Sequence, residues 1–111
     1  MNDFEHNGYR VYESSDGFEP GNGMFAVQSY IAVKDDEVYG FAFCISTIEA
    51  ATHGFNPYDA ALIQKARQTV TSRLDEPDDL TNREEYTFEY NADLEAFGEV
   101  ADARWWNKTP R

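Results

Sequence analysis

The segment VYGFAFCISTI, residues 38–48, is the most apolar strand candidate in the sequence, and it determines the fold that we expect. Successive side chains of a β-strand point to opposite faces of a sheet. Alternation assigns to one face Tyr39, Phe41, Phe43 and Ile45, and to the other face Val38, Gly40, Ala42 and Cys44. The segment therefore predicts a strand that turns its large side chains to the core and its small ones away.

Two further strands are predicted before this segment. GYRVYE, residues 8–13, and MFAVQSYIAV, residues 24–33, are rich in β-branched and aromatic side chains. The polar break at residues 34–37 has the length of an ordinary hairpin loop. We therefore expect a three-stranded antiparallel β-meander.

A helix is predicted after the meander. Asn56 is a favourable N-cap residue, Pro57 suits the first helical position, and Asp59 places a carboxylate near the exposed N–H groups. Apolar side chains then recur at helical spacing until Pro77 forbids continuation, namely Leu62, Ala66, Val70 and Leu74. We expect an amphipathic helix over residues 57–74, packed on the sheet.

The last third of the chain predicts one strand and a short C-terminal element. Tyr86, Phe88 and Tyr90 alternate with polar residues, which is typical of a strand. Leu94 and Phe97, followed by Ala101, recur at helical spacing and favour a short second helix, although a strand over residues 100–106 is the alternative. The expected fold class is thus α+β, as a single domain over residues 1–111.

The composition limits the kinds of partner. The formal net charge is -12 with 15% aromatic residues, so the chain has enough apolar material to fold despite its acidity. Direct binding of nucleic acid or of an anionic membrane is disfavoured by the same charge. The sequence has one cysteine, no basic and apolar leader, and no apolar run that could span a membrane, so we expect a cytoplasmic protein.

The acidic residues are concentrated in residues 75–102, which carry eleven acids and one base. One interpretation is a solvated surface that keeps an aromatic-rich protein from self-association. The other is an ordered array of carboxylates that docks on a basic surface of a partner protein. The candidate partner-binding carboxylates are Glu84, Glu85, Glu89, Glu95, Glu99 and Asp102.

Two aromatic residues are further candidates for partner binding. Phe18 lies between glycines in a ten-residue loop, where it either folds back on the sheet or anchors a partner. Trp105 and Trp106 are adjacent, so one of the two is expected to be buried and the other partly exposed. An exposed Trp106 would suit an interface, including that of a homodimer.

Chemistry-bearing motifs are weak throughout. Cys44 lies in an apolar strand, where a thiol is usually inert, and His6 and His53 lack metal-ligand spacing. Residues 75–79 do not follow the calcium-loop pattern, and no phosphate-binding glycine motif occurs. We therefore expect no metal, no cofactor and no enzymatic activity.

The sequence thus predicts a non-enzymatic acidic binding module, such as an inhibitor or adaptor. Its carboxylates would dock on a basic surface of a partner protein, in the extreme case a surface that normally binds nucleic acid. Two alternatives remain, a self-associating structural protein and a small enzyme that uses carboxylates.

Overall fold

The structure is a computed structural model, and it describes residues 2–15, 23–56 and 58–100. Within these residues, six strands form one sheet in the order in which they occur along the chain. The strands are β1 (Asn2–His6), β2 (Tyr9–Ser14), β3 (Met24–Lys34), β4 (Glu37–Ser46), β5 (Glu84–Asn91) and β6 (Ala96–Glu99). The helices are α1 (Thr47–His53), α2 (Ala60–Leu74) and the 3-10 turn η1 (Pro77–Asp79).

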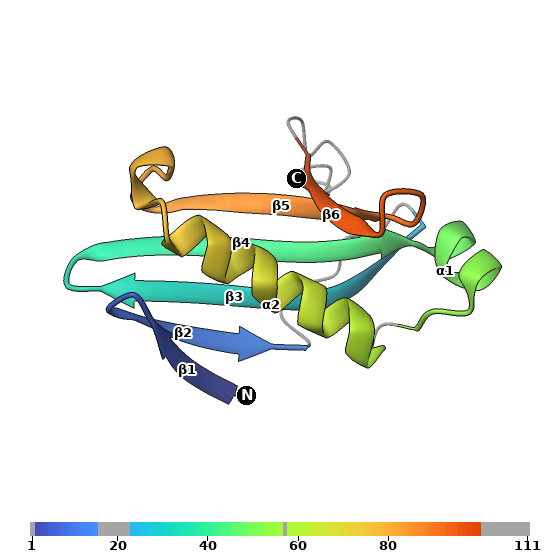
Figure 1. Cartoon of the computed structure of the whole chain (residues 1–111), viewed down its shortest axis with the longest axis horizontal. Coiled ribbons are helices and arrows are strands. Elements are labelled where there is room, and N and C mark those ends of the chain that lie inside the picture. Colours follow the sequence, from blue (N-terminus) through green and yellow to red (C-terminus); the bar gives the residue numbers. More distant parts are fainter. Residues whose placement is uncertain (1, 16–22, 57, 101–111) are drawn as a thin grey trace, which may run out of the picture.

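The sheet is mixed, which corrects the expected fold class of a three-stranded meander, one helix and a fourth strand. Strands β1 to β4 form a four-stranded antiparallel meander, while β5 pairs parallel to β4 and β6 antiparallel to β5. Parallel neighbours need a crossover connection, and α1 and α2 provide it. The chain therefore returns along α2 to the end of the sheet at which β4 begins (Figure 1).

Helix α2 lies across one face of the sheet and buries its apolar stripe there (Figure 1). The buried side chains of the helix are Leu62, Ala66, Val70 and Leu74, as the spacing predicts. On the sheet, Phe43 stacks on Phe88 with ring centroids 4.7 Å apart and meets Phe97 edge-on at 5.0 Å. Such ring pairs add about 0.5–1.5 kcal/mol each beyond the burial of their area, so the aromatics bind β4, β5 and β6 into one core.

The predicted alternation of β4 is confirmed. Tyr39, Phe41, Phe43 and Ile45 all belong to the core beneath α2. We call the opposite side of the sheet, which carries Gly40, Ala42 and Cys44, the outer face. Ala42 and Cys44 are buried there as well, so this part of β4 is enclosed on both sides.

Helix α2 begins three residues later than predicted. Asp59 is its N-cap residue, and its carboxylate accepts a hydrogen bond of 3.0 Å from the Ala61 N–H. Asn56 instead accepts a hydrogen bond from the Tyr58 N–H, which forms a turn ahead of the helix. Two residues with cap chemistry lie close together here, and the second one starts the helix.

Three elements depart from the predicted secondary structure. The strand predicted to continue to Ile48 ends at Ser46, whose hydroxyl accepts a hydrogen bond from the Glu49 N–H and starts α1. The short second helix predicted after β5 is wrong, because Glu95 adopts a φ of 52° in a tight turn that leads into strand β6. At the N-terminus, β1 forms an additional edge strand that the sequence did not predict.

Candidate protein-docking site

One end of the sheet brings together two acidic segments that lie far apart in the sequence. The Asn82 side chain accepts a hydrogen bond of 2.7 Å from the Val38 N–H and donates one of 3.2 Å to the Asp36 carbonyl. The Arg83 N–H donates to the Val38 carbonyl at 2.7 Å. These bonds tie the β3–β4 turn to the connection between α2 and β5.

We call this part of the molecule the acidic end. Its exposed carboxylates belong to Asp35, Asp36, Asp75, Glu76, Asp78, Asp79 and Glu84. The cationic side chains in the same segments are Lys34 and Arg83, and Lys34 lies over the ring of Tyr9. The acidic end therefore carries a clear excess of negative charge on an ordered backbone.

Glu37 adds a further ionised group beside these carboxylates. Its carboxylate accepts hydrogen bonds from the hydroxyls of Tyr39 at 2.6 Å and Tyr9 at 3.0 Å. These two hydrogen bonds hold the pKa of Glu37 below its ordinary value. Glu37 is thus fixed in its charged form at the start of β4.

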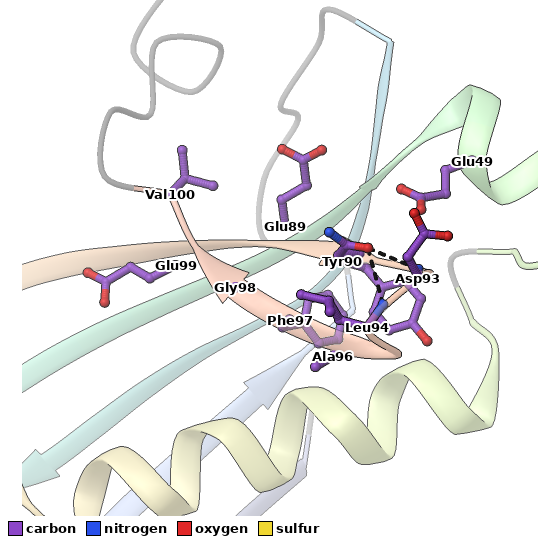
Figure 2. Close-up of a pocket in the computed structure, with 11 residues that line it drawn as sticks. Glu49, Glu89, Tyr90, Asp93, Leu94, Ala96, Phe97, Gly98, Glu99 and Val100 are labelled. Carbon is purple, nitrogen blue, oxygen red and sulfur yellow. Dashed lines mark hydrogen bonds between the residues drawn. The ribbon is translucent and has the colours of Figure 1, made fainter.

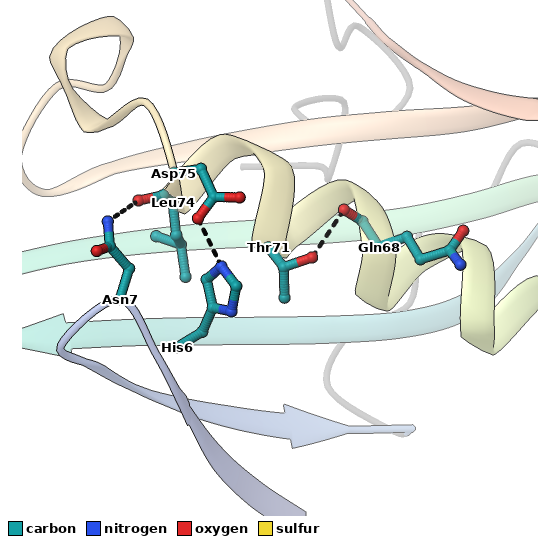
Figure 3. Close-up of polar contacts among 6 residues, drawn as sticks. All are labelled: His6, Asn7, Gln68, Thr71, Leu74 and Asp75. Atoms are coloured by element: carbon teal, nitrogen blue, oxygen red, sulfur yellow. Dashed lines mark hydrogen bonds and ion pairs between the residues drawn. The ribbon is translucent and has the colours of Figure 1, made fainter.

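The C-terminal end of α2 points into the acidic end, as Figure 3 shows. His6 contacts the Asp75 carboxylate at 2.7 Å, and Asn7 donates a hydrogen bond of 2.8 Å to the Leu74 carbonyl. A helix C-terminus carries a partial negative charge and normally favours cations. Placing Asp75 and Glu76 there costs stability, and His6 gives the Asp75 carboxylate a hydrogen-bond partner.

The carboxylates predicted to form one array do not share one face. Glu85 and Glu89 pair with Gly40 and Cys44 of β4 and therefore belong to the outer face. Glu84 belongs to the opposite side, because neighbouring residues of a strand alternate. The expected single array over β5 is therefore corrected to two separate groups.

The remaining predicted site residues lie elsewhere. Glu95 is exposed in the β5–β6 turn, and Glu99 of β6 forms an ion pair with Arg73 of α2. Phe18, Asp102 and Trp106 lie outside the described residues. Among the predicted site residues that the structure describes, only Glu84 belongs to the acidic end.

The turn residues Asp35 and Asp36 are part of the acidic end but were not predicted as site residues. The signal that connects them with residues 75–79 is topological. A strand that runs parallel to β4 must begin at the same end as β4, which is the β3–β4 turn. The sequence suggested a fourth strand but not its direction.

A cavity lies at the end of the sheet opposite the acidic end, beside the β5–β6 hairpin. Figure 2 shows this cavity, which has a volume of about 470 Å³ and is lined by carboxylates that include Glu49, Glu89, Asp93 and Glu99. Burial, and then the charge of Glu49, raise the pKa of Glu89. Glu49 also accepts a hydrogen bond of 2.8 Å from the Ala92 N–H, which attaches the hairpin to α1.

Among the described residues that line this cavity there is no lysine, arginine, histidine, serine or cysteine. Within the described ranges, no group of three or more metal-ligating side chains is arranged to hold an ion. Burial and the charge of Glu49 account for the raised pKa of Glu89. Glu49 itself accepts the hydrogen bond from the Ala92 N–H that attaches the hairpin to α1. We therefore do not assign the partner-binding role to this cavity.

Cys44 has the environment of a core residue. It is fully buried, and its thiol donates a hydrogen bond to the Phe88 carbonyl at 3.3 Å. Burial raises the pKa of this thiol far above its ordinary value. A thiol that stays protonated is a poor nucleophile, so Cys44 fills space in the sheet.

Comparisons with known proteins identify no relative of this chain. No protein-family model, curated protein or solved structure matches this chain. No helix within residues 2–15, 23–56 and 58–100 has the length and apolar character that crossing a membrane requires.

Proposed function

We propose that this protein is a binding module that docks its acidic end on a basic surface of a partner protein. The observation that carries the proposal is the convergence of exposed carboxylates from the β3–β4 turn and the α2–β5 connection, joined through Asn82. Because hydrogen bonds order the backbone of both segments, the charges meet a partner in fixed relative positions. Fixed charges lose less conformational entropy on binding than charges on a flexible tail.

The energetic cost of this arrangement supports a role in binding. Like charges placed close together repel, and Asp75 and Glu76 also oppose the negative end of α2. Charges that serve only solubility can be spread over the surface without this cost. A basic partner would relieve the repulsion, so part of the cost returns as binding free energy.

The partner surface that fits is rich in lysine and arginine, such as one that otherwise holds the phosphates of a nucleic acid. Duplex DNA presents one negative charge per roughly 1.7 Å of its axis, and a compact group of carboxylates competes for the same cations. A protein of this type would act as an inhibitor or an adaptor.

The test compares two variants with the same change in net charge. One variant carries Asp36→Lys and Asp79→Lys, which reverses a charge in each half of the acidic end. The control carries Asp93→Lys and Glu95→Lys in the β5–β6 turn. The probe is a fluorescent peptide of alternating lysine and glycine, and its affinity is measured by anisotropy at low salt.

The acidic-end variant should bind the peptide about tenfold more weakly than the original protein. The control should lose about twofold, because net charge alone acts at long range. Equal losses in the two variants would show that net charge, and not the acidic end, attracts the peptide.

A further inference from the structure

One of the two histidines of the sequence lies against the acidic end. The Nε2 atom of His6 is 2.7 Å from a carboxylate oxygen of Asp75, at the C-terminal end of α2 (Figure 3). The other histidine, His53, lies in the last turn of α1, which follows the far end of β4. A change in the protonation of His6 therefore acts on the acidic end, whereas a change at His53 acts on the opposite end of the sheet.

The contact between His6 and Asp75 has two charge states. A carboxylate only accepts hydrogen bonds, so in the neutral ring Nε2 carries the hydrogen that it donates to Asp75. A second proton, on Nδ1, makes the ring a cation, and the same contact then becomes an ion pair. The His6 side chain is 32% exposed, so protons from the solvent reach the ring.

The neighbouring strand β2 brings further charged groups close to His6. The strand partner of His6 is Tyr9, whose hydroxyl donates a hydrogen bond to Glu37. The Lys34 ammonium lies 5.2 Å from the centre of the Tyr9 ring. Burial, then the hydrogen bond to Glu37 and the charge of Asp78, raise the pKa of Tyr9. The charged groups on this side of His6 are thus two carboxylates and one ammonium.

Strand β1 itself connects His6 with one more cation. Phe4 lies two residues before His6, so the two side chains share a face of the strand. The Arg67 guanidinium is 5.9 Å from the centre of the Phe4 ring, and it is already paired with the Glu13 carboxylate at 2.8 Å. This cation therefore adds little net charge beside His6.

Histidine is the side chain whose charge ordinarily changes between about pH 5 and about pH 8, while lysine and arginine keep theirs. Glu89, whose burial raises its pKa, lies beside the cavity at the opposite end of the sheet. From the position of His6 against Asp75, we infer that His6 makes docking of the basic partner sensitive to protons. A proton on His6 adds a positive charge to the acidic end and weakens its attraction for a basic surface. This inference rests on the proposed function and adds a form of regulation to it.

The test measures the affinity of the fluorescent lysine–glycine peptide, with its N-terminus blocked, at about pH 7.5 and about pH 5.5 in low salt. The charge of this peptide stays the same over the range. The original protein should bind about threefold more weakly at the lower pH, because one charge of the acidic end is neutralised at close range.

Two variants of His6 fix the charge at this position. His6→Gln retains a side-chain donor for Asp75 but takes up no proton, so its affinity should stay high at both pH values. His6→Lys is charged throughout and should bind weakly at both. The matched control His53→Gln should keep the loss of affinity at the lower pH. A loss that persists in His6→Gln would overturn the inference, and the amide NMR spectrum of each variant shows whether its fold is retained.

A second measurement follows the contact without the peptide. The amide NMR signals of Asn7 and Asp75 should move between the two pH values in the original protein, because His6 gains a charge beside them. The same signals should move much less in His6→Gln.

The outcomes separate the two proposals. Binding that is sensitive to Asp36→Lys with Asp79→Lys but equal at the two pH values would retain the docking function and overturn the role of His6. If the peptide binds at neither pH, the docking function fails. In that case equal movement of the Asp75 signal in the original protein and in His6→Gln would overturn the proton-sensitive contact too, while movement in the original protein alone would support it.

Discussion

Arg67 of α2 donates two hydrogen bonds to the carboxylate of Glu13 in β2, one of 3.0 Å from Nε and one of 2.8 Å from a terminal nitrogen. The Tyr30 hydroxyl donates a third hydrogen bond, of 2.7 Å, to the same carboxylate. Glu13 is only 3% exposed, whereas the side chain of Arg67 is 41% exposed. The ion pair between the buried Glu13 of the sheet and the partly exposed Arg67 of α2 thus attaches the helix to the sheet.

Arg67→Met should lower the free energy of unfolding by about 2–3 kcal/mol. Breaking a fully buried ion pair costs about 3–5 kcal/mol and an exposed one less than about 1 kcal/mol, and this pair is intermediate. Lys65→Met is the matched control on the same helix and should change stability by less than about 0.5 kcal/mol. Urea unfolding measures both, and similar values for the two variants would contradict the structural role of Arg67.

The stabilising effect of Glu13 should depend on pH. Burial by itself raises the pKa of Glu13, but the hydrogen bonds from Arg67 and Tyr30 and the charge of Arg67 outweigh it, so the pKa lies below its ordinary value of 4.5. An acid with a lowered pKa stabilises the fold above its unfolded-state pKa, and the effect is lost as the pH falls through the folded-state value.

The original protein should therefore be more stable than Glu13→Gln by about 1.5–3 kcal/mol at pH 7. The difference should hold down to about pH 5 and shrink at lower pH. Comparing the two proteins at each pH removes the contribution of the other acids. A difference that grows as the pH falls below 4.5 would have the wrong sign for a lowered pKa.

Asp59→Ala should cost about 1 kcal/mol, because it removes the acceptor of the Ala61 N–H at the start of α2. Asn56→Ala removes a hydrogen bond only from the turn before the helix and should cost less than half as much. Thermal unfolding followed by circular dichroism compares the two variants. A larger effect of Asn56→Ala would place the functional helix cap at Asn56.

Cys44 should resist modification in the folded protein. Because its thiol is fully buried and has a raised pKa, a thiol-specific disulfide reagent should react at least about 100-fold more slowly than it does in denaturing urea. Rapid stoichiometric reaction in native buffer would contradict the enclosed position of Cys44 between Phe88 and its neighbours in the sheet.

Local patterns in the sequence predicted the central elements well. Alternation in β4 assigned Phe41 and Phe43 to the core, and helical spacing identified the buried stripe of α2, because each pattern reflects burial against one surface. The helix predicted from Leu94 and Phe97 was wrong, because that prediction also used local spacing alone. Their spacing suits a helix, but the turn at Glu95 separates them and places Phe97 on a strand.

The long-range arrangement could not be predicted from these patterns. The direction of β5 depends on the path of the connection from β4, which returns along the sheet through α2, and alternation looks the same in parallel and antiparallel strands. The sequence showed the charge of residues 75–102, but only the three-dimensional structure shows how its carboxylates divide between the acidic end, the outer face and the ion pair of Glu99 with Arg73. The attachment of Asp36 to the connection between α2 and β5 depends on a hydrogen bond from the Asn82 side chain.

The rate of association with the lysine–glycine peptide, measured by stopped flow between about 20 and about 200 mM salt, tests the docking proposal most directly. Positioned charges steer association, so the original protein and the variant with Asp93→Lys and Glu95→Lys should both slow steeply as salt increases. The variant with Asp36→Lys and Asp79→Lys should associate more slowly and depend less on salt. If both variants show the same rates and the same salt dependence, the acidic end is not the docking surface.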